Sequence, residues 1–342
     1  MNNHAGYDKV FQKIVASRQI HECICLIENG KGDYRWSRGY GGRELETPFL
    51  MASITKLFTT ACIIKLLEDS RLKLTDKVSE YLDPDLLKGI HVFKGTDYSY
   101  MLTIAHLLFQ TSGLPDWFLD GKTSYAKRMV QEDFSFSFED VLEATKTIEP
   151  KFAPDTPKKA YYTDINFDML GKIIEAITAL PLRNVYENFI LKPLNLKNTY
   201  LAGEDSGQLP PVYHNHNRLQ RDNFIKSIGA SGGGITNATE LMVFMKAFWS
   251  GKLFDYTLLE LLTTNNRLQL SFYPIAYAGG YMRMKAAYPF KPKIELLGHS
   301  GSTGSFAFYA PEQDIYYVGD VSQFASPAIP IRFVMKLALA AG

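Results

Sequence analysis

The sequence has few cysteines, no long apolar run and almost no net charge, and each absence narrows what the protein can be. The three cysteines, Cys23, Cys25 and Cys62, show no metal-ligand spacing. Cys23 and Cys25 alternate along a probable strand, too far apart along the backbone for an easy disulfide. We therefore expect reduced thiols, which are typical of an intracellular protein.

Charge and hydropathy argue against two further classes of protein. With 37 Lys and Arg residues against 36 Asp and Glu residues, the formal net charge of +1 gives no electrostatic argument for nucleic acid or an anionic membrane. No apolar run approaches the ~20 residues of a membrane span. No signal peptide is visible, because residues 1–5 are not a basic region followed by an apolar one. We expect a cytoplasmic protein, or an extracytoplasmic one if a leader has been trimmed away.

The order of apolar patterns predicts an α+β fold. The 342 residues are 46% hydrophobic and 21% charged, as in ordinary globular proteins. Short segments rich in β-formers predict strands at 22–28, 34–40, 278–285, 293–299, 305–310 and 315–321. Helical spacing predicts helices over 7–17, 103–109, 138–147, 168–178, 182–191, 242–249 and 329–341.

Strands at both ends with helices between them suggest one antiparallel sheet, built from both termini and flanked by helices. We expect a single catalytic domain over residues 1–342. Its sheet lobe would comprise residues 1–73 and 221–342, and its mostly helical inserted lobe residues 74–220. A cleft between the two lobes would be the place for a site.

Ser53 and Lys56 form the most informative motif. Residues three apart on a helix share a face, so the Ser53 hydroxyl and the Lys56 amine can touch. The apolar run 57–67 would bury this helix, and burial near a helix start favours the neutral amine, which can take a proton from serine. The pattern alone fits a helix-capping serine with a surface lysine better, and it recurs at Ser70 and Ser124. Only Ser53 lies between apolar segments.

Two later segments offer chemical partners. Tyr162 precedes an apolar-faced helix, and a neighbouring cation can lower the pKa of a phenol from ~10 so that it acts as a base. His299, Ser300 and Gly301 end a probable strand, where glycine permits close approach to the backbone. The Ser302 N–H could pair with the Ser53 N–H as an oxyanion hole. Taken separately, each segment has a simpler interpretation, namely a packed tyrosine and a glycine-rich hairpin.

The three segments together, in this order and at these separations, resemble the serine β-lactamase and penicillin-binding protein superfamily. The closest similarity is to its class C-like branch, which includes esterases and D-amino-acid peptidases. Further stretches look like that branch, and the resemblance extends over roughly residues 49–323. These stretches are residues 102–108, 111–115, 192–199 and 229–234.

The resemblance implies a β-lactamase-like fold and acyl-enzyme chemistry. Ser53 would attack a carbonyl, and Lys56 with Tyr162 would move its proton. The backbone N–H groups of Ser53 and Ser302 would hold the oxyanion. His299 takes the strand position where penicillin-recognising members carry lysine, and members acting on other substrates often have histidine there.

Two positions depart from the β-lactamases of this branch. Asp164 stands where they usually have asparagine, and an ionised carboxylate can accept from Lys56 but cannot donate to a substrate carbonyl. Trp117 stands where they tend to have a polar amide side chain, and a bulky aromatic there favours an apolar acyl group. Both departures weaken the case for an efficient β-lactamase and leave the case for a serine hydrolase intact.

We therefore predict a serine hydrolase that cleaves a small ester, amide or peptide-like substrate through an acyl-Ser53 intermediate, without metal or organic cofactor. The alternative enzyme is a D-alanyl-D-alanine carboxypeptidase or β-lactamase. An alternative of another class is a penicillin-binding sensor or binding module that is acylated without turnover. No nucleic-acid or membrane partner is expected, and the sequence leaves the oligomeric state open.

Overall fold

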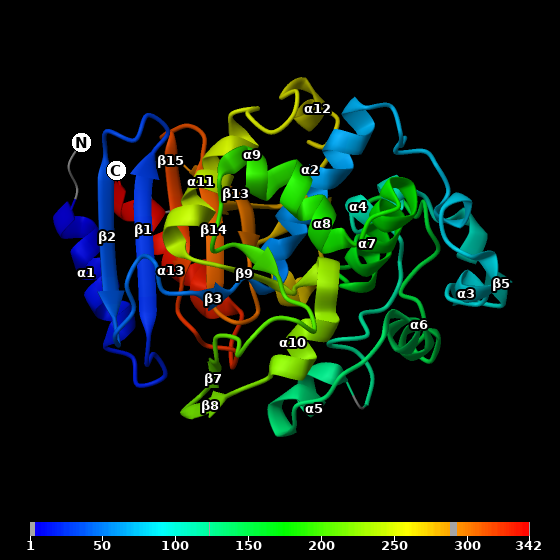
Figure 1. Cartoon of the computed structure of the whole chain (residues 1–342), viewed down its shortest axis with the longest axis horizontal. Helices are drawn as coiled ribbons and strands as arrows, with labels where there is room; N and C mark the ends of the chain where they lie inside the picture. Colours follow the sequence, from blue (N-terminus) through cyan, green and yellow to red (C-terminus); the bar gives the residue numbers. More distant parts are fainter. Residues whose placement is uncertain (1–3, 123, 288–292, 342) are drawn as a thin grey trace.

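The computed structural model describes residues 4–122, 124–287 and 293–341 (Figure 1). Its largest element is an eight-stranded sheet in which all neighbouring strands are antiparallel. The strands lie in the order β10 (Asn266–Arg267), β11 (Ala276–Tyr277), β12 (Met282–Ala286), β13 (Ile294–Ser300), β14 (Ser305–Ala310), β15 (Ile315–Asp320), β1 (Cys23–Asn29) and β2 (Arg35–Tyr40). Because β1 pairs with β15, the expected α+β sheet built from both termini is confirmed.

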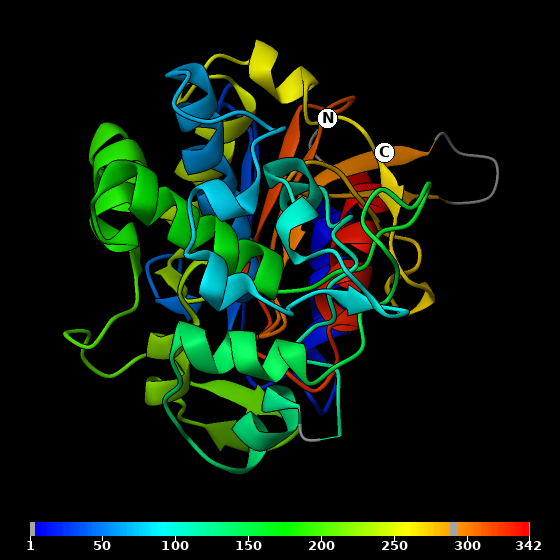
Figure 2. The same cartoon turned by 90° about the vertical axis from the view of Figure 1, so that its right-hand side faces the viewer.

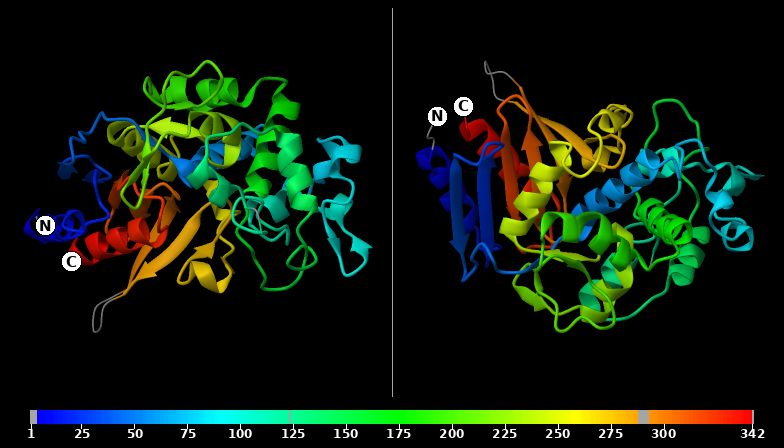
Figure 3. Two further views of the ribbon diagram at one scale, coloured as in Figure 1. Left: turned by 90° about the horizontal axis from the view of Figure 1, so that it is seen from below. Right: turned by 45° about the horizontal axis from the view of Figure 1, so that its top comes forward.

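Helices cover both faces of this sheet (Figure 3). The terminal helices α1 (His4–Val15) and α13 (Ala328–Ala341) pack together on one face, so the two ends of the chain lie close to each other. On the other face, α11 (Ala238–Trp249) packs on β1, β14 and β15. Buried residues recur every three to four positions along both helices, for example Tyr7 and Phe11 in α1 and Val334 and Leu337 in α13. This is the spacing of helices with one face on a core.

The central helix α2 (Thr55–Glu68) lies between the sheet and the helical part of the molecule (Figures 1 and 2). It is buried almost all round, because its residues are apolar or small on every face. Its main helical neighbour is α7 (Ile165–Thr178). The remaining α-helices are α3 (Pro84–Leu87), α4 (Ile104–Leu108), α5 (Tyr125–Gln131), α6 (Phe138–Lys146), α8 (Leu182–Tyr186), α9 (Lys192–Leu194), α10 (Asp222–Ile228) and α12 (Thr257–Glu260).

Short strands and single turns complete the fold. A three-stranded sheet joins β3 (Phe49–Leu50), β9 (Gly234–Thr236) and β6 (Tyr200–Leu201). Two hairpins pair β4 (Val92–Phe93) with β5 (Thr96–Asp97), and β7 (Val212–His214) with β8 (Asn217–Leu219). The 3₁₀ and π turns are η1 (Ala52–Ile54), η2 (Val78–Glu80), η3 (Ser99–Met101), η4 (Glu187–Leu191), η5 (Gly229–Ser231) and η6 (Leu270–Phe272).

Most of the expected elements are present, but the strand expected over 278–285 is only half right. Residues 282–285 do lie in strand β12, whereas residues 278–281 form the turn of a hairpin, because β11 ends at Tyr277, β12 begins at Met282, and the two strands pair with each other. Gly280 has a φ of +90°, which side chains disfavour, and a Cβ there would meet Thr60. Residues 182–191 also differ, since the helix passes into the π turn η4 after Tyr186.

The three cysteines are buried and unbridged. No helix within the described ranges is long and apolar enough to cross a membrane. The division into lobes at residues 74 and 220 stays a prediction, since β6 from the middle of the chain pairs with β9 beyond the second boundary.

Candidate active site

Ser53 lies in η1, the short turn that leads into α2, and the β13–β14 turn holds it there. Thr303 Oγ1 donates to the Leu50 carbonyl at 3.1 Å, and Ser305 Oγ donates to the Met51 carbonyl at 2.7 Å. Ala52, directly before Ser53, has a φ of +45°, a strained conformation for an L-residue. These contacts fix the backbone on the N-terminal side of the serine.

Gly301 permits this close packing. A Cβ at its position would lie 2.5 Å from the Met51 carbonyl oxygen and 2.2 Å from Ser305 Oγ. Any other residue would therefore push the β13–β14 turn away from the Ser53 segment. The glycine brings two parts of the protein backbone together, in addition to bordering the cavity beside Ser53.

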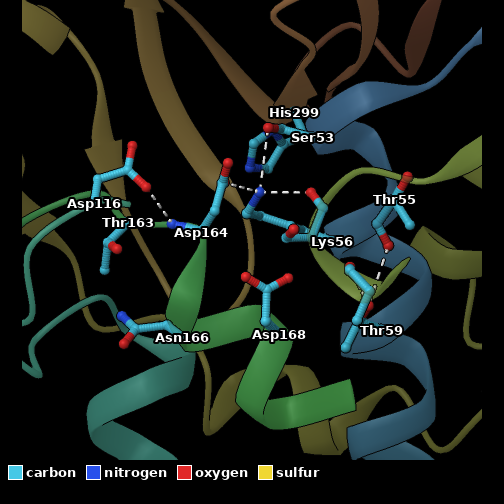
Figure 4. Close-up of polar contacts among 12 residues, drawn as sticks. Ser53, Thr55, Lys56, Thr59, Asp116, Thr163, Asp164, Asn166, Asp168 and His299 are labelled. Atoms are coloured by element: carbon cyan, nitrogen blue, oxygen red, sulfur yellow. Dashed lines mark hydrogen bonds and ion pairs between the residues drawn. The ribbon is translucent and has the colours of Figure 1, made fainter. Parts of the chain in front are cut away.

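Lys56 is fully buried and makes three polar contacts (Figure 4). Its Nζ donates to Ser53 Oγ at 3.2 Å, to Asp164 Oδ1 at 2.6 Å and to the Ser231 carbonyl at 2.6 Å. These three acceptors match the three hydrogens of an ammonium group. The expected contact between Ser53 and Lys56 is thus present, and a carboxylate stands on the other side of the amine.

The loop carrying Tyr162 and Asp164 is fixed by a buried amide. Gln110 donates from Nε2 to the Thr163 carbonyl at 3.0 Å and accepts at Oε1 from the Thr163 N–H at 3.1 Å. Its Oε1 also accepts from Asn166 Nδ2 at 2.7 Å. Gln110 thus binds both backbone groups of Thr163. Tyr162 and Asp164 are the residues directly before and after Thr163, so these hydrogen bonds also position their side chains.

The Tyr162 hydroxyl is buried and makes no hydrogen bond of regular geometry with a described residue, although the Ser53 side chain lies near enough to lower the pKa of the phenol. Its ring stacks on Phe272 with centroids 5.0 Å apart, and Lys56 Nζ lies 5.2 Å from the ring centroid. Burial, and then the charge of Asp164, raise the pKa of the Tyr162 phenol well above 10. The expectation that a neighbouring cation lowers this pKa is wrong for the free protein, because burial and the carboxylate outweigh Lys56.

Two further carboxylates lie near Lys56, and the sequence analysis missed both. Asp116 Oδ1 accepts from the Asp164 N–H at 3.0 Å, and Asp168 follows Asp164 by one turn of α7. Burial, followed by repulsion from Asp164, raises the pKa of Asp116 well above 3.8 and that of Asp168 to about 7. In the sequence, only their positions could have indicated a role. Asp116 directly precedes Trp117, and Asp168 follows Asp164 by four residues.

The strand side of the site is formed by the end of β13. Ser300, Gly301 and Ser302 border the cavity beside Ser53. The Ser302 N–H lies in the turn after β13 and donates to no protein group in the described part of the chain. It is therefore available to a bound oxyanion.

His299 is placed differently from its neighbours in β13. It is fully buried behind the cavity wall, with Nδ1 donating to the Ser300 carbonyl at 2.8 Å and Nε2 accepting from the Tyr277 hydroxyl at 3.3 Å. Burial, and then the charge of Lys56, lower its pKa to about 3, so the ring is neutral. His299 therefore supports the strand from behind, and the expectation that it lines the substrate site is not met.

Trp117 is buried as well. Its Nε1 donates to Asp168 Oδ2 at 2.9 Å, and its ring packs edge-on against Tyr125 with centroids 5.0 Å apart. It borders a small hollow of about 30 Å³ beside Ser53, which shares Phe118, Asp164 and Ser302 with the larger cavity there. A role in acyl selection stays a prediction.

The cavity beside Ser53 has a volume of about 330 Å³, and its wall includes Ser53, Tyr162 and Asp164. The rest of the wall is mostly apolar. Its apolar side chains are Phe118, Leu119, Ala126, Val130, Phe272, Met282, Phe324 and Pro327. A cavity of this size, with a nucleophile at one end, suits a small organic substrate.

Comparison with known proteins agrees with this geometry. The Beta-lactamase family model matches residues 8–330. The chain belongs to the Beta-lactamase family. No group of three or more His, Cys, Asp or Glu side chains that could hold a metal ion is found within residues 4–122, 124–287 and 293–341 of this family member.

Among similar proteins of this family, Esterase EstB of Burkholderia gladioli is 25% identical over 224 residues, which are 61% of this chain and 54% of EstB. The chain thus spans about half of EstB. The D-stereospecific amidohydrolase from Streptomyces sp. superposes with a TM-score of 0.79 at 23% identity, covering 96% of this chain and 97% of that one. The D-amino acid amidase from Ochrobactrum anthropi SV3 gives a TM-score of 0.81 at 15% identity, covering 100% and 99%. These two structures have the same fold.

Proposed function

We propose that the protein is a serine hydrolase that cleaves a small ester or amide through an acyl-Ser53 intermediate. The observation that carries the proposal is the 3.2 Å contact between Ser53 Oγ and Lys56 Nζ, at the wall of a 330 Å³ cavity. A serine hydroxyl is a weak nucleophile unless a base adjoins it, and Lys56 is the base within reach.

The first proton transfer would involve Asp164. Because Lys56 Nζ already serves three acceptors, it must release one proton before it can take the proton of Ser53. Asp164 Oδ1 at 2.6 Å is the carboxylate that can receive it. In net terms the proton moves from Ser53 through Lys56 to Asp164 as the serine oxygen bonds to the substrate carbonyl carbon.

Tyr162 would serve the leaving group. Because its pKa is raised, the phenol carries its proton at neutral pH and can act as a general acid. It would donate that proton to the departing alcohol or amine, and the proton held by the Lys56–Asp164 pair would restore it. The N–H groups of Ser53 and Ser302 would stabilise the oxyanion meanwhile. Water would then release the acid from Ser53.

The substrate class rests on the cavity and on the relatives. The wall is largely apolar, so an apolar acyl group fits it. The names of similar proteins, an esterase, a D-stereospecific amidohydrolase and a D-amino acid amidase, support small ester or amide substrates.

We also infer a reducing compartment such as the cytoplasm, since three buried thiols remain unbridged.

Intact-mass spectrometry, run alongside product release, tests the proposal. The protein and its Ser53→Ala variant would be mixed with p-nitrophenyl esters and, separately, with a penicillin. Ester turnover that is lost in Ser53→Ala supports the proposal. A stable adduct without release would indicate a sensor or binding module, and turnover that persists in Ser53→Ala would refute the mechanism.

A further inference from the structure

Asp116 is a buried acid in the cavity wall that forms no ion pair with any described residue. It borders the cavity together with Ser53 and is 1% exposed. Its Oδ1 accepts from the Asp164 N–H at 3.0 Å, whereas its Oδ2 has no hydrogen-bond partner among the described residues. Buried polar atoms in native proteins are nearly always hydrogen-bonded, so this oxygen calls for an explanation.

Around Asp116, acidic side chains outnumber cations in the part of the chain that the structure describes. Lys56 is the buried cation of the site, and it pairs with Asp164. No Lys, Arg or His in the described part of the chain comes within 4.0 Å of the Asp116 carboxylate. Two basic side chains, Lys127 and His214, also border the cavity, but neither forms an ion pair with Asp116 within the described residues. Lys127 is exposed to solvent, with its Nζ 3.5 Å from a backbone carbonyl. The buried end of the cavity therefore carries an excess of acidic groups, which favours a cationic ligand group.

The remainder of the cavity suits an apolar group. Phe118, Leu119 and Phe272 lie in the same wall as Asp116. We propose that Asp116 binds a protonated amine on the acyl part of the substrate, so that the substrates are esters or amides of amine-bearing acids with an apolar side chain. This inference rests on the proposed function, because it concerns the acyl group that Ser53 would receive.

The pH dependence of substrate preference offers a second test, because Asp116 can be protonated. Asp164 and Lys56 face it on one side, and Asp120, which accepts from its N–H at 2.8 Å, faces it on the other. The phenols of Tyr161 and Tyr162 also lie near it, and Lys127 and His214 border the same cavity. Burial, and then repulsion from Asp164, raise the pKa of Asp116 well above 3.8, so protonation of Asp116 competes with the binding of an ammonium group. A neutral acid attracts an ammonium group less strongly, so the preference for amine-bearing substrates should weaken as the pH falls.

Matched esters test the proposal. The probes are phenylalanine p-nitrophenyl ester, each enantiomer separately, and 3-phenylpropionic acid p-nitrophenyl ester, which lacks only the amine. Each kcat/KM is divided by the spontaneous hydrolysis rate of the same ester, at about pH 6.5, where the α-amine is mostly protonated. We expect the better enantiomer to exceed the neutral ester by about 10- to 100-fold, the range of a buried hydrogen bond to a charged group. Asp116→Asn should reduce the ratio to within about threefold of one.

The control variant is Asp120→Asn, which removes a neighbouring carboxylate that does not border the cavity. It should keep the ratio within about threefold of that of the wild type, since it leaves the charge of Asp116 in place. A wild-type ratio near one, or a ratio that Asp116→Asn leaves unchanged, would overturn the inference. Either result, obtained with Ser53-dependent turnover of the neutral ester, would leave the proposed function standing. Loss of Ser53 dependence would overturn both.

Discussion

The two walls of the cavity differ in what they contribute. The wall built from α2 and the loop before α7 carries the ionisable groups, Lys56 and Asp164, joined by a 2.6 Å ion pair. The wall built from the end of β13 is formed by Ser300, Gly301 and Ser302, which carry no charge. In the proposed mechanism, proton transfer is therefore confined to the helical wall, and the strand wall supplies the Ser302 N–H and shape.

The sharpest test of this comparison removes one hydroxyl from each wall. Ser53→Ala should lower kcat/KM for a p-nitrophenyl ester by about 10⁴-fold or more, because no nucleophile remains. Ser302→Ala should cost less than about tenfold, since the backbone N–H remains available to the oxyanion. Steady-state kinetics of both variants measure the difference. Equal losses of kcat/KM in the two variants would contradict the proposal that the two walls have different roles.

Tyr162→Phe separates chemistry from stability on the helical wall. Removal of a general acid should lower kcat by about 10²- to 10⁴-fold. The hydroxyl makes no hydrogen bond of regular geometry with a described residue, so the free energy of unfolding should stay the same or rise by about 1 kcal/mol. Urea denaturation alongside kinetics measures both quantities. A clear loss of stability would mean that the phenol is structural.

His299 makes the strand wall sensitive to acid. Its folded pKa of about 3 lies below the ordinary 6.5, so its contribution to stability is present above 6.5 and is lost as the pH falls toward 3. Between about pH 7.5 and 4.5 the wild type should lose about 2–3 kcal/mol more stability than His299→Gln. Urea denaturation of both proteins at the two pH values measures this. Equal losses would show that His299 does not titrate in this way.

The smallest effect is expected at Trp117, which lies behind the helical wall. Trp117→Phe keeps an aromatic ring but removes the hydrogen bond to Asp168, so the free energy of unfolding should fall by about 1–2 kcal/mol. The relative rates for p-nitrophenyl esters of different acyl length should change by less than about threefold if Trp117 only packs. A larger change in those rates would establish Trp117 as an acyl-selecting residue.

Much of the fold could be predicted from local pattern. The alternating strands near both termini and the apolar run after Ser53 indicated the sheet and the buried helix α2, because periodicity reflects which face is covered. The 278–285 segment was mistaken for one strand, since β-forming residues on both sides of Gly279 and Gly280 conceal a hairpin. Pairing partners, unlike periodicity, are not local.

The candidate site was predicted in outline, through motifs whose order matches a known family. Asp116 and Asp168 were missed because nothing in their neighbourhood marks them, and only folding brings them near Lys56. The pKa of Tyr162 was predicted in the wrong direction for the same reason. A pKa depends on burial and on all nearby charges, which are set by distant parts of the chain.

The sequence by itself determined the family, the α+β sheet from both termini, and the pairing of Ser53 with Lys56, because residues three apart on a helix must share a face. The tertiary structure decided which groups surround that pair. Asp164 and the Ser231 carbonyl accept hydrogen bonds from Lys56, and His299 is buried in the core. Asp116 Oδ2 in the cavity wall has no hydrogen-bond partner among the described residues. Charge and burial around a site come from contacts between segments far apart in the chain, which local patterns do not encode.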